Sequence, residues 1–377
     1  MGDAGHARRA PRTARHRTVD SSVRFDCIVA GSHLRYAGVW QRPQQLLSRM
    51  ARRVPVLVVE EPFLGAHDGE HRETRGALEV LRPIRTTFDV ERVDDATVAA
   101  VKAWVGARAP LIWLYSPMLL ALAEAFPDAP LVYDCMDELA AFAFAPPQMK
   151  ALERDLSARA NLIFTGGRSL HEARKALGAK VKLYESGVEF ARFAEAARIA
   201  PHALYAHLPR PVYGYFGVID ERLDLEVLEA LARSEAQTVM VGPVVKIDPA
   251  VLPRRPNVHF TGAVDYAELP AFLAGFDVAL LPFARNAATA NISPTKTPEY
   301  LAGGKPVVST PIADVVAGWG DVVEVAETPA AFAAACAAAA AAPDAARIAR
   351  GTERARGAGW DAIAERMWID LWDGQAG

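Results

Sequence analysis

The stretch NISPTKTPEYLAGGKPVVST, residues 291–310, combines a loop, a short helical pattern and a β-type run. Thr297 is a good N-cap, Pro298 suits the first helical position, and Gly303–Gly304 suits the end of a helix. The run PVVST that follows is rich in β-branched residues and favours a strand. This stretch therefore predicts a helix that leads directly into a sheet, as in α/β proteins.

Two opposite charges lie at the start of this predicted helix. Glu299 falls in its first turn, and Thr295 and Lys296 lie immediately before the predicted cap. Backbone N–H groups, the helix dipole and the Lys296 ammonium would attract an anion such as a diphosphate. A carboxylate in the same turn can accept hydrogen bonds from ribose hydroxyls. The alternative is that Glu299 only complements the dipole and that Lys296 is a solvated loop residue.

Short apolar runs alternate with helical patterns through the rest of the chain. This alternation predicts right-handed βαβ units and two tandem parallel sheets covered on both faces, with a boundary near residues 190–210. The predicted strands lie in residues 25–32, 54–62, 111–117, 130–138, 161–167 and 181–189, and in residues 212–219, 237–243, 258–264, 277–283 and 306–310.

Two further helices are predicted near the C-terminal end. The Ala-rich residues 330–342, between Pro329 and Pro343, are a strong helix former. The terminal segment has an apolar stripe at helical spacing, which needs a surface to pack on. This stripe comprises Trp360, Ile363, Met367, Trp368 and Leu371.

Composition excludes several classes of protein. The chain has 377 residues, of which 51% are hydrophobic and 23% charged, as in a soluble globular protein of two or three domains. A net charge of −3 gives no basic field for nucleic acid. The three cysteines are widely spaced and lack CxxC spacing, which indicates reduced thiols in a cytosolic protein. No segment reaches the roughly 18 apolar residues of a membrane span.

The first 22 residues differ from the rest of the chain. They are rich in arginine and almost free of large apolar side chains. Residues 1–22 are therefore predicted to form a disordered basic extension. The alternative is a weak electrostatic tether to anionic lipid.

Residues 291–310 resemble the donor-nucleotide motif of group 1 (family 4-like) glycosyltransferases with the GT-B fold. The segments VYGYFGVIDERLDLEVLEALA, VMVGP and NVHFTGAVDYAELPAFLAGFDVALLPF resemble the donor domain of that family. GVWQRPQQLLSRMA and LVYDCMDELAAF resemble the N-terminal domain of the branch that includes teichuronic-acid and polysaccharide biosynthesis enzymes. The resemblance covers nearly all of residues 25–372. It implies two Rossmann-like parallel-sheet domains that face a cleft, with a C-terminal helix crossing back to the N-terminal domain.

The resemblance also implies domain roles and an activity. Residues 23–195 would bind the acceptor, residues 208–355 would bind a nucleotide-sugar, and residues 356–377 would form the returning helix. The implied enzyme is a hexosyltransferase that moves a sugar from a nucleotide-diphospho-sugar to a glycan or lipid-linked acceptor. The implied pathway is surface polysaccharide or glycoconjugate biosynthesis for a bacterial cell envelope. No cofactor, metal ion or nucleic-acid partner is expected. The expected location is cytoplasmic, with peripheral contact at the inner face of the cytoplasmic membrane as an option.

The resemblance assigns a donor site to the C-terminal half. Glu299 would bind the ribose, and Lys296 would be the main diphosphate contact. Arg222 or Arg285 would assist in stabilising the charge of the leaving group. The predicted nucleotide-sugar residues are Gly217, Gly242, Pro243, Arg285, Asn291, Ser293, Thr295, Lys296, Thr297 and Glu299.

The donor half departs from the family pattern at three positions. Asn291 stands where the family often carries a second glutamate. Val218 and Leu223 stand where it often carries an arginine and a lysine. These departures keep open a catalytically silent nucleotide-sugar-binding partner protein. A sugar-nucleotide epimerase on the same fold is the other alternative.

In the N-terminal half, AGSHLRYAG follows the first predicted strand and lacks the GxGxxG spacing of dinucleotide sites. Gly31, His33 and Arg35 in this segment, with Arg42 at the next helix start, are predicted to line the acceptor site. The alternative is that they are ordinary loop or capping residues.

Three carboxylates, Asp134, Asp137 and Glu138, lie at the end of the strand predicted in residues 130–138. Asp137 is the predicted catalytic carboxylate, since an inverting transferase needs a general base for the acceptor hydroxyl. The alternative is that Asp134 and Asp137 cap a helix or turn. The histidines show no HxxxH or HExxH spacing, so no metal site is predicted.

Overall fold

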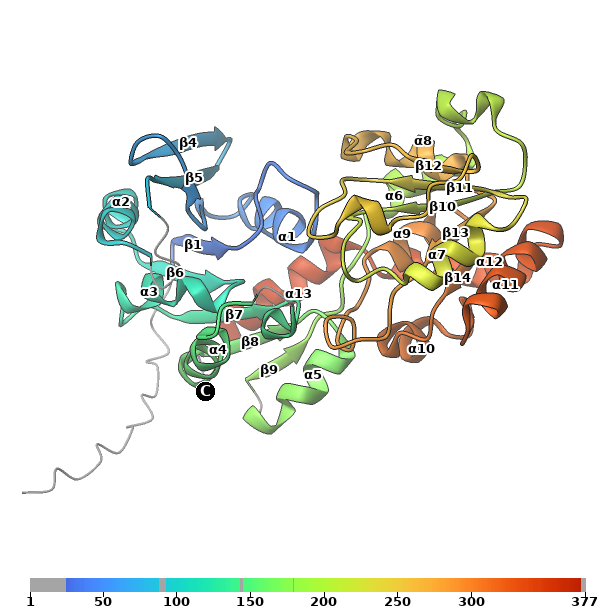
Figure 1. Ribbon diagram of the computed structural model, residues 1–377. Helices are drawn as coiled ribbons and strands as arrows, with labels where there is room; N and C mark the ends of the chain where they lie inside the picture. Colours follow the sequence, from blue (N-terminus) through green and yellow to red (C-terminus); the bar gives the residue numbers. More distant parts are fainter. Residues whose placement is uncertain (1–24, 88–92, 143–144, 179, 374–377) are drawn as a thin grey trace, which may run out of the picture.

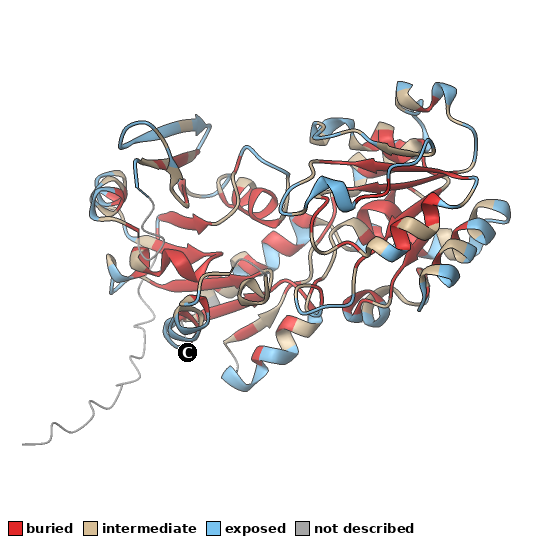
Figure 2. Cartoon of the chain, viewed as in Figure 1, coloured by how far each residue is buried: buried red, intermediate tan, exposed pale blue. Residues whose placement is uncertain are grey.

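The structure is a computed structural model that describes residues 25–87, 93–142, 145–178 and 180–373. Two α/β domains lie side by side, each built around a sheet (Figure 1). Buried strands form the centre of both domains (Figure 2). The extension predicted for residues 1–22 lies outside the described residues.

The N-terminal sheet has nine strands in the order β3-β5-β2-β1-β6-β7-β8-β9, with β4 paired to β5. Its pairs are parallel except β4 with β5, which is antiparallel. The strands are β1 (Cys27–Ser32), β2 (Val56–Glu60), β3 (Phe63–Leu64), β4 (Gly69–Arg75), β5 (Leu78–Arg85), β6 (Pro110–Leu114), β7 (Leu131–Cys135), β8 (Leu162–Thr165) and β9 (Val181–Leu183). The chain winds outward in both directions from β1, so the strand order reverses between β1 and β6.

Both faces of this sheet are covered, as its continuous apolar strands predict. Ile28 and Ala30 of β1 pack in one apolar cluster with α1 and α13, whereas Val29 packs in a second cluster with α2, α3, α4 and α5. The helices are α1 (Arg42–Met50), α2 (Asp95–Val105), α3 (Leu120–Glu124), α4 (Met149–Arg159), α5 (Arg168–Arg174) and α13 (Trp360–Asp373).

The last helix belongs to the N-terminal domain, so the predicted return of the chain is confirmed. Trp360 and Met367 of α13 are buried in the same cluster as α1. The apolar stripe predicted from the sequence therefore packs on the N-terminal domain, whereas the preceding helix, α12 (Ala345–Gly357), lies in the C-terminal domain. The chain crosses between domains at Val188 and Gly359, which form a parallel bridge.

The C-terminal sheet has six parallel strands in the order β12-β11-β10-β13-β14-β15. They are β10 (Val212–Phe216), β11 (Gln237–Val241), β12 (Val258–Phe260), β13 (Val278–Leu281), β14 (Val307–Ser309) and β15 (Glu324–Val325). The helices are α6 (Phe190–Ala194), α7 (Leu225–Ala232), α8 (Leu269–Ala274), α9 (Lys296–Ala302), α10 (Ala313–Trp319), α11 (Pro329–Ala341) and α12 (Ala345–Gly357). The predicted Ala-rich helix is α11.

Short 3-10 helices connect several of these elements. They are η1 (Pro117–Leu119), η2 (Leu139–Ala141), η3 (Lys175–Leu177), η4 (Glu195–Ala197), η5 (Ala203–His207), η6 (Pro249–Val251) and η7 (Tyr266–Glu268). In η4 and η5, Ala196 and Tyr205 are buried in the C-terminal core, together with Phe193 of α6. The apolar core of the C-terminal domain therefore begins near Val188.

Helix α9 begins earlier than the sequence predicts. Its N-cap is Thr295, and Lys296 is the first helical residue. The N-cap prediction for Thr297 is therefore wrong. The Thr297 hydroxyl is buried and has no hydrogen-bond partner within the described ranges. One physical reason is that the Thr297 backbone N–H already donates to the Pro294 carbonyl oxygen at 3.1 Å. This backbone hydrogen bond, and not a side-chain cap, closes the turn before Pro298.

Two glycines that follow adjacent strands are in close backbone contact. Gly217 after β10 has a φ of +133°, and Gly242 after β11 has a φ of +140°. A Cβ on Gly242 would overlap the carbonyl oxygen of Gly217. Gly242→Ala is therefore expected to lower the free energy of unfolding by about 3 kcal/mol, measured by chemical denaturation.

Gly262→Ala is the matched control for this substitution. Gly262 has a φ of +75°, but a Cβ there would meet no atom within 4 Å. It should therefore cost only the backbone strain of about 1 kcal/mol. Equal losses in the two variants would contradict the steric explanation.

Candidate functional site

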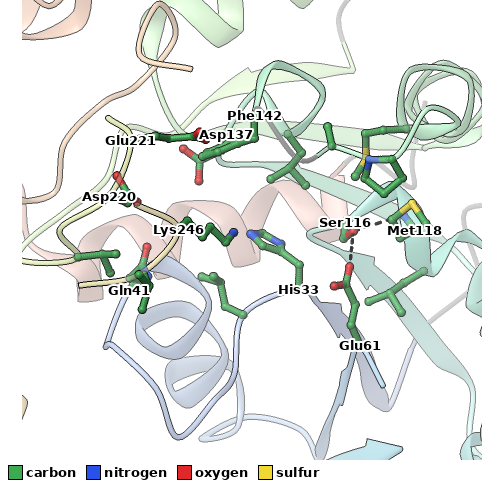
Figure 3. A pocket seen from close by; sticks show the side chains of 18 of the residues that line it. His33, Gln41, Glu61, Ser116, Met118, Asp137, Phe142, Asp220, Glu221 and Lys246 are labelled. Atoms are coloured by element: carbon green, nitrogen blue, oxygen red, sulfur yellow. Dashed lines mark hydrogen bonds between the residues drawn. The ribbon is translucent and has the colours of Figure 1, made fainter. Parts of the chain in front are cut away.

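A cleft of about 440 Å³ lies between the two domains. Its N-terminal wall is formed by residues that follow β1, β2, β6 and β7, and its other wall by residues that follow β10 and β11. The cleft thus lies at the C-terminal ends of the strands, beside the point where the strand order of the N-terminal sheet reverses. Ligands of open parallel sheets bind at such points. Figure 3 shows the side chains that line it.

His33, Glu61 and Ser116 are among the polar side chains of the N-terminal domain that line this cleft. Ser116 Oγ donates to Glu61 Oε1 at 3.0 Å. Burial raises the pKa of Glu61, and the Ser116 hydrogen bond opposes this. Burial and the charge of Lys246 lower the pKa of His33 to about 4. The imidazole is therefore neutral at pH 7 and can accept or donate a hydrogen bond.

The side chain of Lys246 extends from the C-terminal domain toward these N-terminal side chains. Its side chain points toward His33 across the cleft (Figure 3). Its φ of +56° makes it the one non-glycine residue with positive φ in the parts of the chain that the structure describes. Such strained residues cluster at functional sites, where the surrounding structure fixes them. The His33 Nδ1 atom is buried and has no hydrogen-bond partner among the described residues.

Four charged residues, Asp137, Asp220, Arg222 and Lys296, form what we call the charged cluster; the first three line the cleft. Arg222 Nη2 lies 2.7 Å from Asp220 Oδ2. Burial raises the pKa of Asp137, while the Arg222 charge opposes this shift. Burial and repulsion from Arg222 lower the pKa of Lys296 to about 8. Two cations are thus held beside one another at the domain interface.

Lys296 lies over the end of β10. Its Nζ is 5.6 Å from the centre of the Tyr215 ring. A Cβ on Gly217 would lie 2.6 Å from that Nζ atom and would overlap the neighbouring Cε. The glycine after β10 therefore provides the space that this lysine occupies.

Glu299 lies three residues after Lys296, so the two side chains share one face of α9. The Glu299 side chain is buried. Burial raises its pKa to about 8, the Lys296 charge opposes this, and repulsion from Glu189 adds to it. The structure thus places the predicted diphosphate and ribose contacts on one face of α9, with Glu299 buried and Lys296 half-buried.

Arg285 and Pro243, two other residues predicted to bind the donor, contact other parts of the C-terminal domain. Arg285 forms a surface ion pair with Glu327 at 3.2 Å, and its side chain is 61% exposed. It lies outside the charged cluster, which corrects the expectation that it assists Lys296. Pro243 accepts a backbone hydrogen bond from Ile219 N at 2.9 Å, which fixes the loop after β10.

The loop before α9 meets the N-terminal domain. Ser293 lies against Gly167, where an added Cβ would be 2.8 Å from the Ser293 Cβ. Asn291 is half-buried in the turn before it, and Thr295 is the N-cap of α9. The predicted donor loop is therefore in contact with both domains.

Arg42 does not line the cleft, so its predicted acceptor role is wrong. Its guanidinium is fully buried and lies 2.9 Å from Asp134. It also donates to the Tyr184 carbonyl oxygen at 2.7 Å. Arg42 and Asp134 instead join α1 to β7 inside the domain.

Arg35 and Gly31 also contact other residues of the N-terminal domain. Arg35 pairs with Glu60 at 3.2 Å and donates to the Pro62 carbonyl oxygen at 3.2 Å, which holds the segment after β2. A Cβ on Gly31 would lie 2.8 Å from a Leu114 methyl group, so this glycine permits close strand packing. Of the predicted acceptor and catalytic residues of this domain, His33 and Asp137 line the cleft.

Sequence reasoning missed Glu61, Ser116 and Lys246. The first two follow apolar strands directly, in VPVLVVEEP and LIWLYSP. Polar residues at strand ends were the available signal. Lys246 lies in an irregular loop after β11, and no local pattern marks it.

Two sets of contacts join the domains beside the cleft. Asp314 of α10 accepts hydrogen bonds from the Ser169 backbone N–H, at 2.9 Å, and from the Ser169 hydroxyl. Trp40 stacks on Tyr266 with ring centres 5.9 Å apart. Gln45 Nε2 also donates to the Tyr266 hydroxyl at 3.1 Å. These contacts hold the two domains together in the arrangement that forms the cleft.

Within the described residues, no group of three or more His, Cys, Asp or Glu side chains is placed to hold a metal ion. No single helix in those residues has the length and apolarity needed to cross a membrane. Helices α11 and α12 meet that requirement only as a pair, across a bend of 100°.

Comparison with known proteins identifies relatives of this chain. Residues 210–341 match the family described as glycosyl transferases group 1, which confirms the resemblance predicted from the sequence. The chain is 29% identical over 217 residues to TuaH of Bacillus subtilis (strain 168), whose name places it in teichuronic acid biosynthesis as a glycosyltransferase. The match covers 53% of this chain and 55% of TuaH, so the chain spans about half the length of this curated relative.

Solved structures share the whole fold. Sucrose-phosphate synthase from Thermosynechococcus elongatus superposes with a TM-score of 0.70 at 16% identity, covering 92% of this chain and 99% of that one. Anabaena HepE in complex with UDP and glucose gives a TM-score of 0.67 at 16% identity, with the same coverage of 92% and 99%. These similarities show that the two domains adopt the GT-B fold.

Proposed function

We propose that this chain, whose residues 210–341 form a group 1 glycosyl transferase domain within a GT-B fold, is a glycosyltransferase that uses a nucleotide-diphospho-sugar. The observation that carries the proposal is the pair of half-buried Lys296 and buried Glu299 beside Arg222. A cation pair next to a buried carboxylate suits a diphosphate joined to a ribose. The pair lies in the part of the chain that matches the family.

The C-terminal domain supplies the donor side of the reaction. Lys296 and Arg222 would stabilise the negative charge that grows on the departing nucleoside diphosphate. Glu299 would accept hydrogen bonds from the ribose hydroxyls. Because these side chains would neutralise the charge of the diphosphate, the proposal includes no metal ion. HepE, which was solved with UDP and glucose, supports a nucleotide donor and a sugar acceptor in this cleft.

The N-terminal domain supplies the acceptor side. Asp137 follows β7 and is the member of the charged cluster that the N-terminal domain contributes. Because burial raises its pKa, its carboxylate is a stronger base than an exposed aspartate and is better matched to a proton transfer near neutral pH. We assign it the acceptance of the proton from the acceptor hydroxyl. Contacts such as Ser169–Asp314 would close the domains and exclude water during transfer.

The pathway belongs to the proposal as well. Similarity to TuaH supports synthesis of a surface polysaccharide or another envelope glycoconjugate on a glycan or lipid-linked acceptor. The three free, buried cysteines fit a reducing, cytoplasmic compartment. Peripheral contact with the inner face of the cytoplasmic membrane would bring the cleft to a lipid-linked acceptor.

The experiment that tests this proposal measures release of nucleoside diphosphate from a panel of UDP- and GDP-sugars, with and without membrane extract. Release that depends on the extract is expected. Conversion of the donor to an isomeric donor without extract would identify an epimerase instead. Binding without any turnover would identify a silent partner protein.

Asp137→Asn is expected to reduce acceptor-dependent release by roughly 100-fold or more, because general-base catalysis contributes that much. Its affinity for UDP or GDP should stay close to that of the unchanged protein, as measured by calorimetry. The control is Asp155→Asn, an exposed aspartate of α4. Loss of nucleotide affinity equal to the loss of activity would show that Asp137 serves the donor site instead.

A further inference from the structure

The cleft has an apolar side and a charged side. The large apolar side chains of the N-terminal domain that line it include Val93, Met118, Leu119, Leu139, Phe142 and Met149. They come from the segments before α2, after β6 and after β7, and from the start of α4. The charged side is formed largely by the loops after β10 and β11. An occupant of this cleft therefore meets two different surfaces.

The two surfaces meet at Phe142. Its ring lies 5.9 Å from the Arg222 guanidinium carbon and 5.9 Å from Lys246 Nζ. Asp137 and Leu139 both line the cleft and are only two residues apart in the chain. A hydroxyl placed at Asp137 therefore brings its nearest substituent against Leu139 and Phe142. That substituent gains most if it is apolar, since burial removes its surface from water.

The charges of the cleft oppose a second anion. Among its described lining residues, Glu61, Asp137, Asp220 and Glu221 are acidic, whereas Arg222 and Lys246 are basic. Arg222 is already paired with Asp220 and would also face the donor diphosphate. A phosphate on the acceptor would then meet more carboxylates than cations. Like charges in such a partly buried site are costly.

We propose that the acceptor is an uncharged molecule whose reacting hydroxyl sits next to a hydrophobic aryl or alkyl group, and that sugar phosphates are rejected. This inference rests on the proposed glycosyltransferase function and names its acceptor class. The hydrophobic group lies against Leu139, Phe142 and Met149, and the hydroxyl lies at Asp137. Lys246 and His33 hold the polar part of the acceptor between the domains.

The test uses the full chain saturated with UDP or GDP, whichever binds. Calorimetry then measures binding of 4-nitrophenyl β-glucoside, glucose and glucose 6-phosphate. The aryl glucoside should bind at least about tenfold more tightly than glucose, because its ring is buried on the apolar side. Glucose 6-phosphate should bind more weakly than glucose. Tightest binding of glucose 6-phosphate, or equal binding of the aryl glucoside and glucose, would overturn the proposal.

Two variants make the test specific. Leu139→Asn should reduce aryl glucoside affinity about tenfold while leaving UDP or GDP affinity unchanged. Leu177→Asn is the control, because Leu177 is 42% exposed and lies outside the cleft lining. Unchanged aryl glucoside binding in Leu139→Asn would overturn the proposal. Failure of nucleotide binding in the unchanged protein would instead refute the proposed function, so the two failures are distinguishable.

Discussion

Replacing Lys296 by methionine is expected to lower the affinity for UDP or GDP by roughly 30- to 100-fold, because hydrogen bonds to charged groups contribute about 1.5–3 kcal/mol each. The side chain lies over Gly217 beside Arg222, so its loss leaves one cation for the diphosphate. Calorimetry with UDP, UMP and uridine measures the effect. The loss should be largest for UDP and smallest for uridine, because uridine has no phosphate.

The same lysine should make nucleotide affinity depend on pH. Burial, with repulsion from Arg222, lowers the pKa of Lys296 to about 8, while Glu299, Asp220 and Asp137 oppose the shift. In the free protein the ammonium therefore loses its proton near pH 8. A bound diphosphate favours the protonated form, so affinity should fall as the pH rises through that value. Lys296→Arg should reduce this dependence, since a guanidinium stays charged throughout the range.

Ionisation of Glu299 acts in the opposite direction. Burial raises its pKa to about 8, so the carboxylate that accepts from the ribose hydroxyls forms over the same range and partly offsets the loss of the Lys296 charge. The slope that remains in Lys296→Arg measures this second contribution. Arg285→Met is the control for loss of a surface cation, because Arg285 pairs with Glu327 outside the charged cluster. A fall in UDP affinity with Arg285→Met as large as that with Lys296→Met would contradict the assignment.

The parallel sheets could be predicted because their central strands are buried on both faces and therefore appear as continuous apolar runs. The β4–β5 hairpin could not. Residues 69–75 of β4 read GEHRETR and are largely exposed (Figure 2). Their strand conformation comes from pairing with β5 and from charge pairs such as Arg72 with Glu79 at 2.8 Å. Such pairing depends on tertiary structure, which a periodicity of apolar residues does not report.

The candidate site also contains residues that could be predicted from the sequence and residues that could not. Lys296 and Glu299 could be predicted because one helical turn brings them together within a short motif. Lys246 could not, because its approach to His33 depends on how the two domains face each other. Arg42 was misassigned because a cation at a helix start looks the same in sequence whether it faces a cleft or a buried carboxylate. Only its full burial against Asp134 distinguishes the two.

Replacing Glu299 by alanine is expected to weaken UDP binding by roughly 10- to 100-fold, because ribose hydroxyls would lose a charged acceptor. The informative comparison is UDP with 2′-deoxy-UDP, measured by calorimetry on both proteins. If Glu299 accepts from the 2′-hydroxyl, the unchanged protein discriminates against the deoxy ligand and the variant does not. The two changes then remove one shared interaction, so their effects on the binding free energy are not additive.

Glu327→Ala is the matched control, since Glu327 is an exposed glutamate of the same domain that pairs with Arg285. It should retain both the affinity for UDP and the preference for UDP over 2′-deoxy-UDP. A purely structural role for Glu299 predicts a different pattern, in which both ligands weaken by the same factor and the preference survives. Retention of the preference in Glu299→Ala would therefore refute the ribose assignment. Because Glu299 is buried beside Lys296, thermal unfolding of the free variant should be measured alongside, so that a change in folding is not read as a change in binding.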